Sequence, residues 1–167
     1  MPEKIVETPF PLIDVDPYAG RVIRYMRPSD YAWWAGLTAA FPGALWFWER
    51  MDKMATKPPR TALRVGGILG FVGGFLFAYQ RSSLRFWGWT ENKREEEMDY
   101  KEMSTRAAKG LPLYGESNEP EWVQGAAHRN SVYSQLKFQV FPMFNLVNHP
   151  YHGVDPAKYK PKEEPSQ

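Results

Sequence analysis

The 167-residue sequence contains no cysteine. The chain therefore cannot form disulfides, bind a metal through thiolates or hold an iron–sulfur cluster with its own cysteines. It also lacks a strong excess of either charge, since 21 Lys and Arg against 19 Asp and Glu leave a net charge of +2. So small a charge gives no argument for nucleic-acid binding.

Catalytic motifs are missing as well. There is no G-x-S-x-G nucleophile elbow, P-loop, H-E-x-x-H or dinucleotide fingerprint. Of the three histidines, His149 and His152 are separated by Pro150, His128 stands apart, and no Cys, Asp or Glu spacing completes a zinc pattern. The sequence therefore predicts no catalytic residues, no cofactor and no metal site, and no enzymatic activity of the chain itself.

Two apolar runs dominate what is present. The first, Tyr31 to Trp48, has eighteen residues without a charge, and the second, Val65 to Tyr79, has fifteen. As a helix the first would span about 27 Å, close to the roughly 30 Å hydrocarbon core of a bilayer. Because the mean hydropathy of the whole chain is −0.53, the apolar content is concentrated in these runs. We expect an all-α membrane protein built on a two-helix transmembrane hairpin.

The remaining segments are organised around this hairpin. Four prolines before residue 18 predict an extended arm, because proline restricts both its own backbone and its predecessor's. With no core of its own, such an arm would lie disordered or, as we favour, pack on a partner protein. The predicted division is an extended arm with a basic juxtamembrane segment (1–28), transmembrane helix 1 (29–48), a basic loop (49–60), transmembrane helix 2 (61–80), and extramembrane helices with an extended tail (81–167).

Small residues recur at spacing four in both predicted spans. Such stripes let helix backbones approach closely, which drives helix association in lipid. The partner of each stripe could be the other span or another protein. Neither uncharged run contains an acidic residue or a histidine, so we expect no proton relay within this chain. The predicted helix-packing residues are Ala32, Gly36, Ala40 and Ala44 in the first span and Gly66, Gly70 and Gly74 in the second.

Aromatic and basic residues flank the spans. Tryptophans and tyrosines at the ends of the runs are typical of interfacial belts, the alternative being the aromatic core of a soluble protein. Three arginines spaced by three precede the first span, where they could bind lipid headgroups or simply set topology. The predicted headgroup contacts are Arg21, Arg24, Arg27, Trp87 and Trp89. The basic loop favours the cytosol-like or matrix side of the membrane, which would place both tails on the opposite side, although the three arginines before the first span favour the reverse.

The C-terminal third predicts two helices and a tail. Residues 90–110 are highly charged and predict a solvated helix capped by Thr90 and stopped by Gly110. Asn118 with Glu121 resembles a capping box that opens a second helix. Residues 136–150 predict an amphipathic or partner-binding stretch, and the polar, Pro-rich end predicts an extended tail.

Several strings along the chain carry a family resemblance. In order they are VETPFPLID, RPSDY, YQRSS, ENKRE, PLYG, NSVYS, LVNH and HGVDPAKY. Together they resemble a fungal accessory subunit of mitochondrial complex I (NADH:ubiquinone oxidoreductase), of the NUXM type. The resemblance covers nearly the whole chain, although no string encodes a reaction.

The resemblance implies an inner-membrane subunit with two helices and no redox centre that helps to assemble or stabilise the proton-pumping membrane arm. The implied partners are other membrane-arm subunits and membrane lipids, with cardiolipin as a candidate. No catalytic residues can be carried over. The alternative is a free-standing two-span membrane protein that binds anionic lipid or shapes an organelle membrane.

Overall fold

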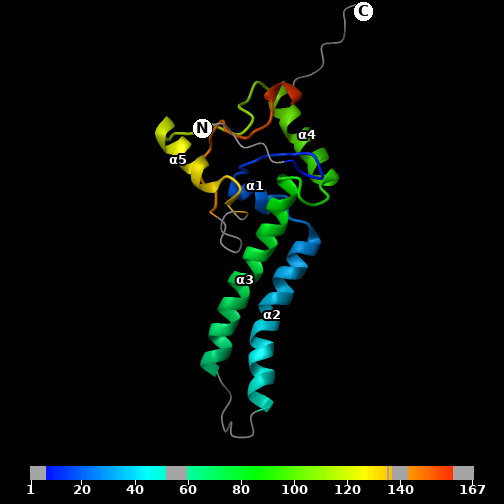
Figure 1. The fold of residues 1–167 in the computed structure, drawn as a ribbon, viewed down its shortest axis with the longest axis vertical. Coiled ribbons are helices and arrows are strands. Elements are labelled where there is room, and N and C mark those ends of the chain that lie inside the picture. The colour runs from blue at the N-terminus through cyan, green and yellow to red at the C-terminus, as the bar shows by residue number, and fades with distance from the viewer. Residues whose placement is uncertain (1–6, 52–59, 135, 137–142, 160–167) are drawn as a thin grey trace, which may run out of the picture. The chain divides into compact units, whose positions relative to one another are not determined.

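A computed structural model describes residues 7–51, 60–134, 136 and 143–159 of the chain (Figure 1). No strand occurs in these ranges, which agrees with the predicted all-α class. The chain divides into two compact units. We call residues 26–82 the helix pair and the rest, from both ends of the chain, the terminal unit.

The helix pair consists of α2 (Pro28–Met51) and α3 (Arg60–Phe86), which run side by side in opposite directions (Figure 1). Both helices cover the predicted spans and extend beyond them. The last residues of α3, from Ser83 on, belong to the terminal unit. Most of the predicted basic loop, residues 52–59, lies outside the described residues.

Among the helices that the structure describes, α3 alone is long and apolar enough to qualify as a membrane span. Its best 18-residue window has a mean hydropathy of 1.6, and only 22% of that window is buried. Helix α2 is uncharged from Tyr31 to Trp48, but it contains four Trp, two Gly and two Pro, which score low on hydropathy scales. The two-span topology therefore stays a prediction.

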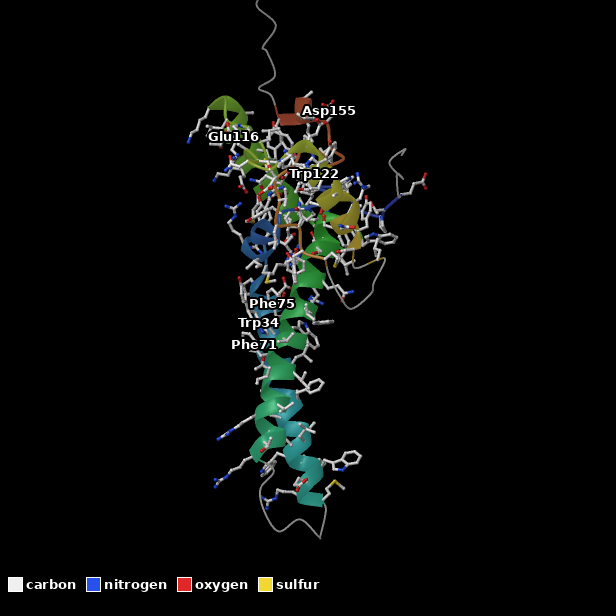
Figure 2. The ribbon with its side chains drawn as sticks, turned by 90° about the vertical axis from the view of Figure 1, so that its left-hand side faces the viewer. Trp34, Phe71, Phe75, Glu116, Trp122 and Asp155 are labelled. Atoms are coloured by element: carbon white, nitrogen blue, oxygen red, sulfur yellow. The ribbon has the colours of Figure 1, made fainter. Side chains whose placement is uncertain are left out.

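Three glycines of α3, which we call its glycine face, lie against α2: Gly66, Gly70 and Gly74. A Cβ atom added at Gly70 would come within 3.0 Å of two backbone carbonyl oxygens of α2, and one added at Gly74 within 2.7 Å of the carbonyl oxygen of Trp34. Next to this contact the Trp34 ring packs on Phe71 and Phe75, with ring centroids 5.1 Å apart in each case (Figure 2). Within the helix pair, α2 is thus the partner of the glycine face of α3.

The small residues of α2 point elsewhere. Ala32, Gly36, Ala40 and Ala44 are exposed in this chain. A Cβ atom added at Gly36 would meet no atom within 4 Å, leaving its own helix backbone aside. We call these four residues the α2 outer face. None of them is among the nearest neighbours of Gly66, Gly70 or Gly74.

The terminal unit combines α1 (Ala19–Arg24), α4 (Lys93–Ala108), α5 (Glu121–Ser131), the 3₁₀ turn η1 (Pro156–Tyr159) and the extended arm before α1 (Figure 1). Its apolar core includes residues from both ends of the chain. Fully or nearly fully buried there are Ile13, Val22, Tyr25, Phe86, Trp87, Met103 and Tyr159.

The described part of the arm, residues 7–18, contains no helix or strand, and it packs on its own chain. Residues 13–17 are buried. The backbone N–H groups of Ile13 and Asp14 donate to the Phe86 carbonyl oxygen, and that of Val15 donates to the His152 carbonyl oxygen at 3.1 Å. The expectation that the arm lacks a core of its own is therefore wrong for this segment.

Two glycines allow the arm to lie so close. Gly88 (φ +73°) and Gly153 (φ +67°) both adopt left-handed backbone conformations that favour glycine. A Cβ atom at Gly88 would lie 2.3 Å from the Phe10 carbonyl oxygen, and one at Gly153 would lie 2.6 Å from a methyl group of Val15. Each glycine thus makes room for one part of the arm.

The C-terminal helices differ from the prediction at their starts and on one face. Helix α4 begins after Asn92 instead of Thr90, and its last residue, Ala108, comes two residues before Gly110, the predicted stop. Helix α5 begins after Pro120 instead of Asn118. The expectation of a fully solvated helix is wrong, because one face of α4 is buried and carries Glu95, Asp99 and Met103. The described part of the predicted extended tail ends with η1, where Tyr159 is fully buried.

Candidate functional site

The terminal unit buries an unusual number of polar side chains. They come from the arm, α1, α4, α5 and the segment before η1, and the most enclosed are Asp14, Asp16, Arg21, Asp99, Ser131, Asn145, His149 and His152. Burying a charge is costly unless the group is paired and hydrogen-bonded. These side chains meet that condition through two neighbouring clusters, one around Asp14 and the other around Asp16.

The Asp14 cluster consists of Asp14, Arg21, Asp99, His152 and Tyr159. The Arg21 guanidinium bridges two carboxylates: Nη1 lies 3.2 Å from Asp14 Oδ2, and Nη2 binds Asp99 Oδ1. The Tyr159 hydroxyl donates to Asp99 Oδ2 at 2.6 Å. Burial alone would lower the pKa of Arg21, but the two carboxylates outweigh it and raise that pKa, so the guanidinium stays charged.

His152 also contacts this cluster. Its Nδ1 lies 2.8 Å from Asp14 Oδ1 and its Nε2 lies 2.7 Å from the His149 carbonyl oxygen. The ring thus links the Asp14 carboxylate to the backbone of the segment before η1. Burial, followed by the hydrogen bond to Asp99, raises the pKa of Tyr159, which keeps its hydroxyl a neutral donor.

The Asp16 cluster consists of Asp16, His128, Ser131, Asn145 and His149. One carboxylate oxygen, Asp16 Oδ2, lies 3.1 Å from His128 Nδ1, 2.8 Å from His149 Nε2 and 2.7 Å from Ser131 Oγ. The Asn145 side chain donates to the Asp16 backbone carbonyl oxygen at 3.0 Å. The cluster therefore joins the arm to α5 and to the C-terminal segment through one carboxylate.

The ionisation of Asp16 follows from these partners. Burial by itself would raise the pKa of Asp16, but the hydrogen bonds from His128, His149 and Ser131 outweigh it and hold that pKa below its ordinary value. A carboxyl whose pKa is lowered on folding stabilises the fold above its unfolded pKa, about 3.9 for Asp. That contribution is lost as the pH falls through the folded pKa.

Asp16→Asn should therefore lower the free energy of unfolding by about 1.5–3 kcal/mol at pH 7, the range for hydrogen bonds to a charged group. The difference between wild type and variant should shrink as the pH falls below about 4, because the unfolded wild-type chain binds a proton at Asp16 there, whereas the folded chain binds it only at lower pH. Thermal unfolding of the full chain between pH 2 and 7 measures both. Asp155→Asn, at an exposed position, serves as the control. A difference that stays constant down to pH 2 would contradict the role of the Asp16 charge.

A pocket of about 410 Å³ opens beside the Asp14 cluster, lined among others by Arg21, Arg24, Arg106 and Tyr114. The cations at this pocket already have partners in the chain. Arg21 is paired as described, Arg24 lies 2.8 Å from a Glu102 carboxylate oxygen, and Arg106 donates to the Pro112 carbonyl oxygen. The pocket lining therefore does not favour an anionic ligand over a cationic one.

The predicted headgroup residues divide into two groups. Arg21 (6% exposed) and Trp87 (2% exposed) lie in the core, and the Trp87 indole N–H donates to the Val15 carbonyl oxygen. For these two the headgroup prediction is wrong. The Arg24 side chain is 62% exposed, Trp89 is 38% exposed and Arg27 is half-buried, so these three stay candidates.

Sequence reasoning missed Asp14, Asp16, Asp99 and Asn145 altogether. The one available signal was the pair of aspartates in an otherwise apolar arm, facing the histidines near the C-terminus. Nothing in the local spacing could join them, because the contacts run from position 14 to 152 and from 16 to 128 and 149.

Comparison with known proteins identifies the family over both units. The family model of the 21 kDa subunit of NADH-ubiquinone oxidoreductase, complex I, matches residues 7–91, and the model of the C-terminal part of the same subunit matches residues 100–166. The chain is also similar to the NADH-ubiquinone oxidoreductase 20.9 kDa subunit of Neurospora crassa. The two are 49% identical over 164 residues, which cover 96% of this chain and 86% of the relative.

The family matches extend over the arm, the helix pair and the C-terminal segment that together build the fold described above. The resemblance noted in the sequence is thereby confirmed at the level of the family. The chain belongs to the family of the 21 kDa subunit of NADH-ubiquinone oxidoreductase, complex I.

Proposed function

We propose that this chain is a non-catalytic accessory subunit of the membrane arm of mitochondrial complex I. It crosses the inner membrane twice through the helix pair and supports assembly and stability of the proton-pumping oxidoreductase. Family membership and the name of the Neurospora relative support the assignment to complex I. The membrane-arm location, the two spans and the supporting role are our inference.

The observation that carries the proposal is the α2 outer face. The glycine face of α3 packs against α2, whereas Ala32, Gly36, Ala40 and Ala44 are exposed in this chain. In lipid, apolar side chains gain little from leaving the solvent, so close backbone packing at small residues becomes a main source of helix association. The α2 outer face thus fits a transmembrane helix of a neighbouring subunit.

The remaining surface of α2 favours an apolar environment. At 24 residues the helix is about 36 Å long, enough to cross a bilayer. It exposes Trp33 (50%), Phe47 (62%) and Trp48 (80%), and contiguous apolar surface of this kind marks membrane or protein contacts. Asp30, the buried carboxylate of α2, pairs at 3.1 Å with Arg81 and lies just before the uncharged run that begins at Tyr31.

Orientation and lipid contacts follow from the charges. The basic residues of the 49–60 segment favour the matrix side, which puts the terminal unit in the intermembrane space. Arg24, Arg27 and Trp89 are the candidates for contact with anionic headgroups, cardiolipin included. The exposed Trp122 of α5, labelled in Figure 2, is 75% exposed and is a candidate contact for another subunit.

The direct test is co-migration. After mild detergent solubilisation of mitochondria, the tagged chain should run on a native gel with the band that oxidises NADH, and mass spectrometry of that band should find membrane-arm subunits. Deleting the gene should reduce the amount of assembled complex while leaving NADH oxidation per assembled complex unchanged. A chain that migrates alone beside intact complex I would contradict the proposal and favour a free-standing, lipid-binding protein.

A further inference from the structure

We propose that Asp16, His128 and His149 form a binding site for one divalent transition-metal ion, with Zn²⁺ as the ion that the donor set fits best. One ligand atom from each residue lies within 4.8 Å of the other two. Two imidazoles and a carboxylate are donors that zinc commonly uses, with a fourth position left for water. This inference is independent of the role in complex I and differs from the sequence-based expectation of no metal site.

The spacing of the donors suits an ion of this size. With zinc–nitrogen and zinc–oxygen distances of roughly 2.0–2.2 Å, donors around a tetrahedral ion lie about 3.3 Å apart. Asp16 Oδ2 lies 3.1 Å from His128 Nδ1 and 2.8 Å from His149 Nε2. These two pairs of donors therefore need to separate by only a few tenths of an ångström to take the ion, and the ligand atoms of the two histidines lie within 4.8 Å of each other.

The surroundings hold the ligands in place. Asn145 donates to the Asp16 backbone carbonyl oxygen, and its own carbonyl oxygen accepts the Val147 N–H at 3.1 Å, so the orientation of its amide is fixed. Ser131 Oγ lies 2.7 Å from Asp16 Oδ2. Outer partners of this kind orient metal ligands and raise affinity. The Asp16 and His149 side chains are almost fully buried, while His128 is 14% exposed and offers a path for the ion.

The protons around His149 show what binding would change. The Tyr151 N–H donates to His149 Nδ1, so Nε2 carries the ring proton and points it at Asp16. Asn145 Nδ2, also a donor, lies 3.1 Å from the same Nε2, which leaves two donors facing each other. An ion at Nε2 would take the place of that ring proton, which would move to Nδ1 and face the Tyr151 N–H. The donors of Asn145 and Tyr151 must therefore shift for the ion to bind.

The ion would join three distant parts of the chain. Asp16 belongs to the arm, His128 to α5 and His149 to the segment before η1. The site would thus close the terminal unit around the buried arm. An ion that binds only the folded state stabilises that state. Once the ion concentration exceeds the Kd, the stabilisation grows with the logarithm of the ratio of concentration to Kd.

The test uses the full chain, purified in mild detergent and freed of metal by a chelator. Titration with Co²⁺, followed by visible absorption, should show one tetrahedral site per chain, and Zn²⁺ should displace the Co²⁺. Zn²⁺ should also raise the melting temperature of the wild-type chain. No stoichiometric Co²⁺ or Zn²⁺ binding by the wild type would overturn the proposal.

Matched histidine variants locate the site. His128→Gln and His149→Gln should weaken binding by more than about 100-fold, since loss of an outer partner alone costs roughly 10–100-fold. His152→Gln is the control, because His152 is equally buried and three residues from His149 but binds Asp14. Its affinity should stay close to that of wild type. Equal weakening by His149→Gln and His152→Gln would overturn the assignment, and His128→Gln at the partly exposed rim decides the matter should the buried variants not fold.

Discussion

Replacing Arg21 with methionine is expected to lower the free energy of unfolding of the terminal unit by about 3–5 kcal/mol, the usual cost of removing one partner of a buried ion pair. The variant keeps the length and apolar stem of the side chain but leaves Asp14 and Asp99, each at most 1% exposed, without their shared cation. Thermal or denaturant unfolding of the full chain in detergent, followed through the tryptophans, measures the loss.

Arg24→Met is the matched control. Arg24 lies one turn further along α1, and its exposed guanidinium makes one ion pair, with Glu102 at 2.8 Å. Exposed pairs contribute about 0–1 kcal/mol, so this variant should be nearly as stable as wild type. Adding Asp99→Asn to Arg21→Met removes one of the two orphaned charges and should recover part of the loss. Equal effects of the two arginine variants would show that the buried pairing does not stabilise the fold.

The same comparison tests the headgroup contacts suggested by the sequence. Arg24→Met should bind vesicles that contain anionic lipid more weakly than wild type does. This difference should be larger at low salt, because ions screen exposed charges. Any drop in vesicle binding by Arg21→Met should instead match the fraction of this variant that is unfolded.

The helices of this protein could be predicted from the sequence because their signals are local. The uncharged run from Tyr31 to Trp48 and the glycine-rich run that follows set the approximate bounds of α2 and α3. Gly110 ends α4 in a left-handed conformation, as its position after a helical pattern indicates. The predicted starts of α4 and α5 both lie two residues too early, because Asn92 and Pro120 compete with equally plausible caps nearby.

The core of the terminal unit could not be predicted, because its contacts are long-range. Three arginines spaced by three look alike in the sequence, yet Arg21 is buried between two carboxylates while Arg24 is exposed. What separates them is the position of Asp99, 78 residues away. Likewise, the many charges of α4 predict a solvated helix. The buried face becomes apparent only from the partners of Glu95 and Asp99, which are arginines outside this helix.

The stripes of small residues were visible in the sequence, but the partner of each stripe was not. The structure brings Gly66, Gly70 and Gly74 against α2 and leaves Ala32, Gly36, Ala40 and Ala44 exposed. The two stripes therefore make separate predictions, one about the helix pair itself and one about its neighbours.

Gly70→Leu should disrupt the helix pair. A Cβ atom at this position would lie 3.0 Å from the carbonyl oxygens of Leu37 and Thr38 and from Phe41 Cβ, so α2 and α3 must separate. Overpacking of this kind costs about 1–3 kcal/mol, and more where the backbone cannot yield. The amounts of both the chain and the assembled complex should fall. Gly67→Leu is the control, since a Cβ atom there would meet nothing within 4 Å beyond its own helix backbone.

Gly36→Leu should leave the helix pair intact, because a Cβ atom at Gly36 meets no neighbour, yet it should reduce the assembled complex by blocking close approach of a helix from another subunit. The contrast lies in the ratio of free to assembled chain: Gly70→Leu lowers both, whereas Gly36→Leu lets unassembled chain accumulate. Native gels and immunoblots of the same mitochondria give that ratio. If Gly36→Leu assembles like wild type, the α2 outer face contacts lipid, and the docking of a neighbouring helix has to be sought on the exposed aromatic residues of the pair instead.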